Sequence, residues 1–308
     1  MSSVGEELGR VYDGLPVWGK AAAVGGVALI VYLPYKWFVS VPRSSPFKKD
    51  FKKGIVYLYQ FPRSRAVPCL SPFCLKLETW LRISDIPYEN VEIPLNVRSR
   101  EGTLPFVELD GREYPDSGFA IKNLTILMKK EVLDSHLNDE QRAISRAYEN
   151  LIETSLLMSY NLTGRIPHVS EMFALLPPSF SLLRPIVSWF AQRSFISKMV
   201  LASKSCGISK HSDDDIVKIG EDDLKAISVY LGSKHYFTGF KPTRIDAALF
   251  GMLSQIIYMP FDTSHKQFIA EKCPNLKDFC ERVKARYWPD WDDCTTNFAL
   301  NSDRKKKT

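Results

Sequence analysis

The sequence lacks the cysteine pattern of a disulfide-rich secreted protein or a structural zinc site. Its six cysteines are spread through 308 residues without dense spacing, as in reduced intracellular proteins. A zinc site would need cysteines two to four residues apart with a second pair or histidines downstream, and that arrangement is absent. We therefore expect neither a disulfide framework nor a dedicated metal site from Cys69, Cys74, Cys206, Cys273, Cys280 and Cys294.

Charge of one sign is not gathered into a field large enough for a nucleic acid. The formal net charge is +6, but the surplus lies mainly in residues 43–53 and in the run from Arg304 to Lys307. A nucleic-acid-binding domain usually carries a basic stripe along one face or one helix. We therefore expect no nucleic acid as the main partner.

Long hydrophobic runs are scarce, and the one that stands out lies near the start of the sequence. Residues 21–35 carry no charge and are bounded by Lys20 and Lys36. A membrane-spanning helix needs about 20 apolar residues, so a span requires both lysines to snorkel and residues 17–41 to form the whole element. Aromatic residues near both ends, Trp18 and Trp37, fit an interfacial belt. The segment predicts a single membrane anchor.

The flanking charges predict how such an anchor would be oriented. Basic residues are in excess after it, from Lys36 to Lys53, so the positive-inside rule places the globular part in the cytosol. A cleaved secretory signal is disfavoured because Glu6 and Glu7 precede the run and no small-residue cleavage site follows it. A buried or disordered leader is the remaining alternative.

A strand, a helix and a second strand begin the globular part. Residues 55–61 read IVYLYQF, an unbroken β-branched and aromatic run typical of a strand buried on both faces. Ser71 then offers a helix cap and Pro72 suits the first helical position. Apolar residues at helical spacing follow, and residues 88–93 predict the second strand.

A hairpin and another helix come next. Residues 106–109 predict a strand, Asp110-Gly111 a tight turn and residues 112–114 the returning strand. Asp116 or Ser117 can cap a helix over 118–129. The order β-α-β followed by β-β-α predicts a thioredoxin-like fold.

The second half of the sequence predicts helices only. Asn138 with Gln141, and Thr243 with Asp246, have the spacing of reciprocal helix caps. Residues 180–200 are rich in apolar and aromatic side chains, which suit either core packing or the wall of a second-substrate pocket.

Three short motifs resemble the glutathione-transferase superfamily. Ser71-Pro72-Phe73-Cys74 resembles the glutaredoxin Cys-Pro-aromatic-Cys motif with serine in the nucleophilic position. Leu104-Pro105 matches the cis-proline step before the third strand. Asp116-Ser117 matches the acidic-serine pair that holds the γ-glutamyl group of glutathione. The resemblance implies catalytic roles for Ser71 and Cys74, and glutathione contacts from Leu104, Pro105, Asp116 and Ser117.

Each motif residue also has a purely structural interpretation. Ser71 could donate a hydrogen bond to a bound thiolate or simply cap its helix. Cys74, on the first helical turn, is either an acidified thiol or a buried packing residue. A cis Leu104-Pro105 bond would expose backbone for an extended peptide, whereas an ordinary trans bond would not. Capping alone would also explain Asp116-Ser117.

One departure weakens the interpretation as an enzyme. Only about ten residues separate the second strand from Pro105, so the helix that usually follows strand two in this fold is shortened or missing. The resemblance implies that this helix contributes glutathione contacts, so the short connection counts against that part of the expected site.

Over roughly residues 54–293 the sequence is most similar to the failed-axon-connections family, which includes nematode cadmium-responsive proteins and is related to metaxins. The resemblance implies a stress-linked (cadmium or detoxification) or neuronal role. It rests on these segments: Leu70–Thr79, Ile86–Asn90, Glu140–Ala143, Gly239–Ala247, Cys273–Leu276 and Tyr287–Trp291.

Two functions remain open. The first is a membrane-anchored enzyme that binds glutathione and conjugates it to a small hydrophobic electrophile or exchanges thiols. The second is a non-catalytic, metaxin-like adaptor that forms a homodimer or binds another protein. Fold alone does not decide between them.

These expectations combine into one architecture of class α/β plus all-α. A thioredoxin-like N-terminal domain is followed by a glutathione-transferase-like helical C-terminal domain, with an N-terminal membrane anchor. The expected segments are a tail at 1–16, the anchor at 17–41, a basic linker at 42–53, the thioredoxin-like domain at 54–133, the helical domain at 134–293 and a basic tail at 294–308.

Overall fold

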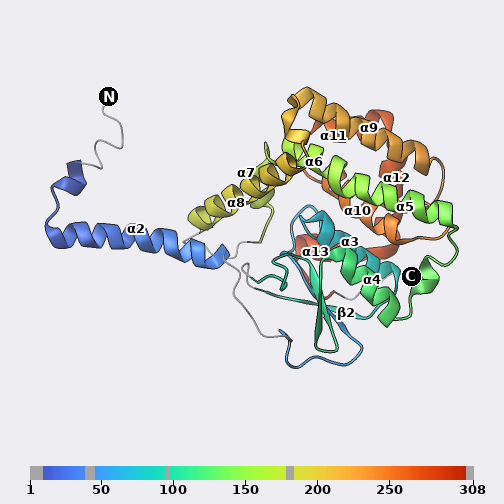
Figure 1. The fold of residues 1–308 in the computed structure, drawn as a ribbon, viewed down its shortest axis with the longest axis horizontal. Helices are drawn as coiled ribbons and strands as arrows, with labels where there is room; N and C mark the ends of the chain where they lie inside the picture. The colour runs from blue at the N-terminus through green and yellow to red at the C-terminus, as the bar shows by residue number, and fades with distance from the viewer. Residues whose placement is uncertain (1–9, 39–45, 94–96, 178–183, 303–308) are drawn as a thin grey trace.

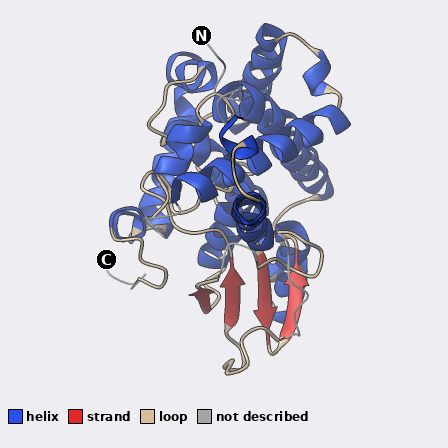
Figure 2. Cartoon of the chain, turned by 90° about the vertical axis from the view of Figure 1, so that its left-hand side faces the viewer, coloured by secondary structure: helices blue, strands red, loops and turns tan. Residues whose placement is uncertain are grey.

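A four-stranded sheet with two helices packs against a larger set of helices (Figures 1 and 2). This computed structural model describes residues 10–38, 46–93, 97–177 and 184–302. In Figure 2 the strands lie together at one end of the molecule and helices fill the other end. The family of folds inferred from the sequence, thioredoxin-like followed by all-helical, is confirmed.

The sheet has the strand order β2-β1-β3-β4. β1 pairs with β2 in parallel and with β3 in antiparallel orientation, and β3 pairs with β4 through the hairpin. Asp110 and Gly111 have φ values of 50° and 76°, the left-handed conformation that a tight hairpin turn requires. The strands are β1 (Val56–Tyr59), β2 (Tyr88–Val91), β3 (Phe106–Leu109) and β4 (Arg112–Pro115).

Two helices cover one face of the sheet. α3 (Pro72–Ile83) and α4 (Ser117–Leu127) bury apolar side chains against β1 and β3. On α3 these include Leu77, Trp80 and Leu81, the residues whose spacing predicted the helix. α3 therefore lies between the sheet and the helical half, and its first turn is fixed from both sides.

The opposite face of the sheet is covered by the segment that leads into β1. Tyr59 stacks on Phe106 with ring centroids 4.4 Å apart, and Phe47 meets Tyr59 edge-on at 5.5 Å. The buried carboxylate of Glu108 accepts hydrogen bonds from the Phe47 N–H at 2.7 Å and the Tyr59 hydroxyl at 2.6 Å. Residues 46–53, assigned by the sequence to a linker, thus contribute to packing on the sheet.

No helix follows β2 in the described residues between it and β3, which are 92–93 and 97–105. This agrees with the shortened connection that the sequence predicts. The aromatic side chains of the 46–53 segment cover sheet surface that would otherwise be exposed, because Phe47 and Phe51 pack against Tyr57, Tyr59 and Phe106.

The helical half begins with one long helix that changes pitch along its length. Both reciprocal caps predicted from the sequence are present, at Asn138 with Gln141 and at Thr243 with Asp246. The elements are η1 (Glu131–Leu133), α5 (Asp139–Leu151), η2 (Ile152–Leu156), α6 (Leu157–Tyr160), η3 (Asn161–Arg165), α7 (Val169–Ala174), α8 (Arg184–Ser205), η4 (Ile208–Lys210), α9 (Asp213–Leu231), α10 (Arg244–Ile257), α11 (Ser264–Lys272), α12 (Pro274–Tyr287) and α13 (Trp291–Thr296).

α10 joins the two halves by crossing α3 at very short range. A Cβ atom on Gly251 would lie 2.6 Å from the carbonyl oxygen of Pro72 and 3.0 Å from the amide nitrogen of Lys76. Only a residue without a side chain allows this approach. Gly251 thereby sets how close the helical half can come to the first turn of α3.

The expected membrane anchor at residues 17–41 is a wrong prediction. The segment does form a helix, α2 (Val17–Phe38), which projects away from the sheet and meets the rest of the molecule near α8 (Figure 1). In the part of the chain that the structure describes, however, no helix is both long enough and apolar enough to cross a membrane. The physical reason is that the charge-free run between Lys20 and Lys36 holds fifteen residues, short of the roughly 20 that a span needs. The membrane as a partner and the cytosolic orientation were inferred from the anchor alone, so these two predictions lose their support.

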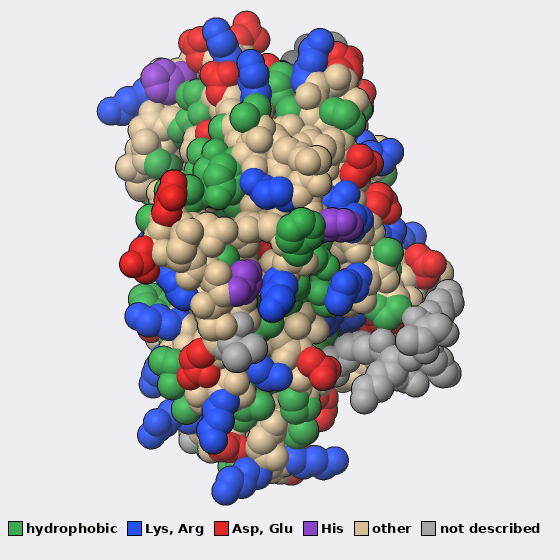
Figure 3. Space-filling view, turned by 90° about the vertical axis from the view of Figure 1, so that its right-hand side faces the viewer, with side chains coloured by type: hydrophobic (Ala, Val, Ile, Leu, Met, Phe, Trp, Pro, Cys, Tyr) green, Lys and Arg blue, Asp and Glu red, His purple; other side chains and the backbone are tan. Residues whose placement is uncertain are grey.

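The face of the molecule shown in Figure 3 mixes charges of both signs. On the face shown in Figure 3, acidic and basic side chains alternate with apolar ones rather than gathering into a field of one sign. Large exposed apolar side chains do gather on α4, where Phe119 is 63% exposed, Ile126 61% and Leu127 49%.

Candidate functional site

The sheet register brings the three motif segments to one end of the sheet. Tyr59, at the end of β1, lies opposite Phe106, at the start of β3, and Phe106 lies opposite Pro115, at the end of β4. The loop to Ser71, the Leu104-Pro105 step and the Asp116-Ser117 pair all leave the sheet from this row. The structure therefore places the sequence-predicted site residues at the same end of the sheet, which we call the motif end.

Ser71 begins α3 as a helix cap. Its backbone is extended, with φ −94° and ψ 122°, and its Oγ accepts the Cys74 N–H at 3.4 Å. Pro72 occupies the first helical position, where no amide hydrogen is needed. The capping interpretation of Ser71 is thus confirmed, whereas its role toward a bound thiol stays a prediction.

The thiol of Cys74 is completely buried beside a second cysteine that the sequence interpretation did not use. Burial raises the pKa of the Cys74 thiol, but hydrogen bonds with the Cys69 thiol, the Ser71 hydroxyl and the Phe61 backbone outweigh it and hold the pKa below its ordinary value. Burial raises the pKa of the Cys69 thiol well above its ordinary value. Cys74 is therefore the more acidic thiol of an adjacent pair.

Arg98 supplies a positive charge near Cys74. Burial lowers the pKa of its guanidinium, and the Cys74 charge acts in the opposite direction, so the two groups lie within electrostatic range. The guanidinium stacks 5.4 Å from the centroid of the Phe61 ring. Lys198 of α8 is close enough for Arg98 to lower its pKa in addition to the larger effect of burial. Neither cation was predicted, because their positions depend on the connection from β2 and on how α8 packs.

The peptide bond between Leu104 and Pro105 is cis, as the motif predicts. Pro105 is buried and Leu104 is half-buried against the aromatic cluster on the sheet face. Because this bond directly precedes β3, it lies at the same end of the sheet as Tyr59 and Pro115. The step has the geometry expected of it, and its use by a ligand stays a prediction.

Asp116 caps α4 from a backbone conformation that is uncommon for a residue with a side chain. Its φ is 62°, and its Oδ1 accepts the Gly118 N–H at 2.8 Å and the Phe119 N–H at 3.0 Å. Residues held in sparsely populated conformations concentrate at functional sites. Ser117, which follows, is buried. The carboxylate is thus engaged by its own helix, and a role in ligand binding stays a prediction.

A buried network of charges holds α3 in place next to the motif end of the sheet. Glu78 is fully buried and accepts both Arg63 nitrogens at 2.7 and 2.8 Å, and Arg82 at 3.3 Å. Burial alone would raise the pKa of Glu78, but the two arginines hold it well below its usual range. Arg82 also binds Asp290 at 2.5 Å, which links α3 to the residue that precedes α13.

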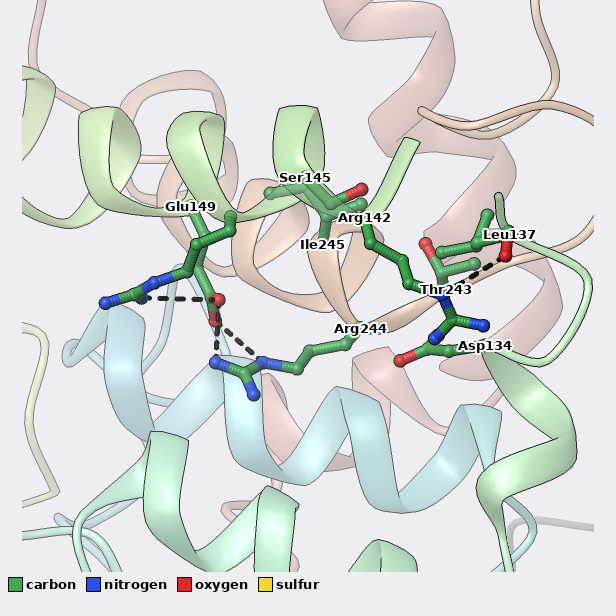
Figure 4. Close-up of a pocket in the computed structure, with 9 residues that line it drawn as sticks. Asp134, Leu137, Arg142, Ser145, Glu149, Thr243, Arg244 and Ile245 are labelled. Atoms are coloured by element: carbon green, nitrogen blue, oxygen red, sulfur yellow. Dashed lines mark hydrogen bonds and ion pairs between the residues drawn. The ribbon is translucent and has the colours of Figure 1, made fainter. Parts of the chain in front are cut away.

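One cavity lies away from the motif residues, at the seam between the two halves. It has a volume of about 150 Å³ and lies between α5, the start of α10 and the connection that precedes α5. Figure 4 shows Arg244 facing Glu149, whose carboxylate it binds at 3.0 and 2.6 Å. Lys76 of α3 reaches the same carboxylate at 2.7 Å, so Glu149 ties α3, α5 and α10 together. We interpret this cavity as part of the joint between the halves.

Lining a second-substrate pocket was one of two interpretations of residues 180–200, and none of these residues lines the cavity of Figure 4. Residues 180–183 lie outside the described part of the chain, and the described side chains of α8 include exposed Trp189 and Leu201. Elsewhere, α8 packs its Phe195 against Arg165 and Phe173. The apolar and aromatic content of this segment did not distinguish a helix that packs on the surface from one that lines a pocket.

Two family models match the chain in the expected order. The glutathione S-transferase N-terminal domain matches residues 72–163, and the glutathione S-transferase C-terminal domain matches residues 220–283. Among solved structures, a glutathione transferase homolog from Sulfitobacter with bound glutathione has a TM-score of 0.49 and 12% identity, covering 80% of this chain and all of that one.

Two similar proteins belong to the metaxin-related group. Failed axon connections of Drosophila melanogaster is 38% identical over 265 residues, which is 83% of this chain and 63% of that protein. The Metaxin-1 homolog of Caenorhabditis briggsae is 26% identical over 247 residues, which is 75% of this chain and 74% of that protein. This chain therefore spans less than two thirds of the length of Failed axon connections.

Proposed function

Because the chain belongs to the metaxin-related family of glutathione-transferase-fold proteins that includes Failed axon connections, we propose that it is a non-catalytic protein-binding module. Such an adaptor suits the role in axon connections that the name of the Drosophila relative indicates. Detoxification by conjugation to glutathione would instead require a reactive site with turnover.

The observation that carries this proposal is the engagement of Ser71 by its own chain. A transferase needs a hydroxyl or thiol that faces a bound substrate thiol. Here the Ser71 Oγ accepts the Cys74 N–H at 3.4 Å and so caps the first turn of α3. The Cys74 thiol is itself fully buried. Both groups that the enzyme hypothesis assigns to chemistry therefore stabilise the first turn of α3.

The apolar face of α4 supports a protein partner. Phe119 and Ile126 are seven residues apart, so they lie on the same side of the helix, and Leu127 follows at its end. Each is about half exposed or more, which is unusual for three large apolar side chains on one short helix. We propose this face as the surface that binds the partner, either a second copy or another protein.

Turnover assays test the non-catalytic proposal. We expect the purified chain to conjugate glutathione to 1-chloro-2,4-dinitrobenzene no faster than the uncatalysed reaction, and Ser71→Ala to leave that rate unchanged. Turnover by the wild-type chain that falls at least tenfold, about 1.4 kcal/mol, in Ser71→Ala would overturn it. Asp292→Ala, an exposed substitution on α13, is the matched control.

Substitutions on α4 test the partner surface. Light scattering after size-exclusion chromatography should show dimers that Phe119→Asp with Ile126→Asp converts to monomers, with helix content unchanged. Val229→Asp, an equally exposed apolar position on α9, should leave the dimers intact. A wild-type monomer would indicate that the partner is a different protein, whereas dimers that persist in the α4 variant would contradict this surface.

Glutathione binding without catalysis is a second candidate function. It is favoured by two cations, Arg98 and Lys198, near the motif end of the sheet. Arg98 lies within electrostatic range of both Cys74 and Lys198. The cis Leu104-Pro105 bond lies at the same end of the sheet. Two cations could neutralise the two carboxylates of the tripeptide. We propose that glutathione, if it binds, binds at the motif end of the sheet as a ligand.

Calorimetric titration with reduced glutathione distinguishes this candidate. A true site would lose at least tenfold in affinity, about 1.4 kcal/mol, in Asp116→Ala and in Arg98→Ala, while Asp292→Ala would bind like the wild type. Equal affinities in all four proteins would place the ligand elsewhere.

A further inference from the structure

The cavity between the two halves has one end where the chain balances its own charges and one end where it does not. At the first end, the carboxylate of Glu149 is bound by Arg244 at 3.0 and 2.6 Å and by Lys76 at 2.7 Å. At the other end, Figure 4 shows the guanidinium of Arg142 next to the side chain of Asp134. The Arg142 end is therefore where a ligand would find charged groups that are still available.

Three polar groups that line the cavity have bonding capacity that the described chain leaves unused. Arg142 donates from its Nε to the Leu137 carbonyl oxygen at 3.1 Å, and its two terminal nitrogens make no hydrogen bond to the described residues. The Asp134 Oδ1 and the Ser145 Oγ are both shielded from solvent, and neither has a hydrogen-bond partner within the described ranges. Shielded polar atoms in native proteins nearly always have a partner, so these two atoms indicate a missing one.

The three groups are held in place around one space. Ser145 follows Arg142 by three residues, so the two side chains lie on the same face of α5. Asp134 comes directly after η1, and Figure 4 shows Arg142 reaching from α5 toward it. No ion pair or hydrogen bond joins Arg142 to Asp134 in the part of the chain that the structure describes. A cationic fork, a hydroxyl and a carboxylate oxygen thus line the same cavity.

We propose that this cavity binds a small zwitterion, a free α-amino acid of the size of glycine or alanine. The ligand's carboxylate accepts hydrogen bonds from the Arg142 fork and the Ser145 hydroxyl, and its ammonium group donates to the Asp134 Oδ1. The volume of about 150 Å³ sets the size, because a cavity of about that volume holds benzene, which is about as large as alanine. This inference does not depend on the proposed adaptor function or on the motif end of the sheet.

A ligand with only one of the two charges fits less well. A simple anion would pair with Arg142 but would leave the Asp134 Oδ1 without a donor and bring a second negative charge beside it. A simple amine would pair with Asp134 but would leave the terminal nitrogens of Arg142 without an acceptor. The two charges of an α-amino acid are complementary to both side chains.

Equilibrium dialysis of the full chain against radiolabelled alanine tests the proposal. We expect saturable binding of one alanine per chain, and we expect unlabelled glycine to displace it. Acetate, which lacks the ammonium group, and methylamine, which lacks the carboxylate, should not displace alanine at the same concentration. Inorganic phosphate serves as a further anion and should also fail to displace it.

Substitutions assign the binding to this cavity. Arg142→Gln and Asp134→Asn should each lower the affinity for alanine at least tenfold. Arg142 is exposed on α5, so its replacement should leave the chain folded. Arg286→Gln, at an exposed position on α12, is the matched control and should bind alanine like the wild type.

Thermal unfolding gives a second measurement. A ligand that binds only the folded chain raises the midpoint of unfolding, so alanine at saturation should raise the Tm of the wild type and of Arg286→Gln. The Tm of Arg142→Gln should not change with alanine at the same concentration.

Three results would overturn the proposal. One is the absence of saturable alanine binding to the wild-type chain. The second is displacement of alanine by acetate or phosphate as effective as by glycine, which would indicate a general anion site. The third is unchanged affinity in Arg142→Gln, which would place the ligand elsewhere. The first two results come from the wild type and do not depend on whether a variant folds.

Discussion

At the scale of single residues, one side chain often serves the backbone and a potential ligand with the same atom. Ser71 caps α3 through the oxygen that would face a thiol in a transferase, and Asp116 caps α4 through the carboxylate that would face an ammonium group. The sequence could name these residues because capping and binding both select short polar side chains at helix starts. It could not choose between the two uses.

Glu78 provides a test of the buried charge network. Glu78→Ala leaves the guanidinium groups of Arg63 and Arg82 without their shared carboxylate inside the protein. Removing one member of a buried ion pair costs about 3–5 kcal/mol, and we expect the free energy of unfolding to fall by that amount. Denaturant titration measures it. Glu271→Ala, at an exposed position on α11, is the control, and a similar loss in both variants would show that the network contributes nothing special.

His265 makes stability depend on pH. The ring is fully buried, with its Nε2 2.9 Å from the Ser159 Oγ, and burial lowers its pKa from 6.5 to about 4. Between these values the unfolded chain binds a proton that the folded chain does not, so stability falls as pH falls through this window. The loss amounts to about 3 kcal/mol in total, at about 1.4 kcal/mol per pH unit.

His265→Gln isolates this effect. The difference in free energy of unfolding between the wild type and the variant should shrink as pH is lowered from 7 toward 4. Burial raises the pKa of Asp246 to about 6, which acts in the opposite direction, but both proteins share this contribution and it cancels in the difference. A difference that is constant with pH would refute the assignment, and exposed His211→Gln should behave like the wild type.

At the scale of elements, the contact between α3 and α10 depends on one missing side chain. Gly251→Ala would gain about 1 kcal/mol of helix propensity, but its Cβ would collide with the backbone of Pro72 and Lys76. Overpacking of this kind costs about 1–3 kcal/mol, and rigid backbone atoms cannot swing aside, so we expect net destabilisation.

Thermal unfolding of Gly251→Ala against Gly25→Ala checks this prediction. A Cβ on Gly25, in α2, would meet nothing within 4 Å, so that variant should show no loss of stability. If Gly251→Ala is as stable as the wild type, the two helices are free to move apart and the contact does not constrain the joint.

Elements were predicted from the sequence where local chemistry decides them. The β3-β4 hairpin followed from Asp110-Gly111, and α5 and α10 followed from their caps. The short connection after β2, where the described residues 92–93 and 97–105 form no helix, followed from chain length alone. The anchor was wrong because α2 is a real helix whose apolar run is too short, and an apolar run near the length limit predicts a helix better than it predicts a span.

At the scale of the whole molecule, contacts between distant parts of the sequence complete the thioredoxin-like half. Asn301 pairs with the edge strand β2, because its side chain accepts the Asn90 N–H at 2.7 Å and donates to the Asn90 carbonyl oxygen at 2.9 Å. The carbonyl oxygens of Ala299 and Leu300 accept hydrogen bonds from Arg63, each at 3.0 Å. No sequence pattern marks these contacts, since they join residues more than 200 positions apart.

Asn301→Ala should expose this edge. Two hydrogen bonds to β2 are lost, and we expect the free energy of unfolding to fall by about 1–2 kcal/mol and the Asn90 amide to exchange its hydrogen faster. Asn297→Ala, which bonds only within α13 and its end, is the control. Unchanged protection at Asn90 would show that the segment does not hold the strand.

The pairing of Arg63 with residues 299 and 300 has a consequence for biosynthesis. The ribosome makes Arg63 more than 200 residues before it makes the backbone carbonyl groups that accept its hydrogen bonds. The guanidinium of Arg63 in the nascent thioredoxin-like half therefore lacks these two acceptors until almost all of the described chain has been synthesised. A translation arrest before residue 299 would leave this half open to proteases and chaperones, however well its own strands and helices have formed.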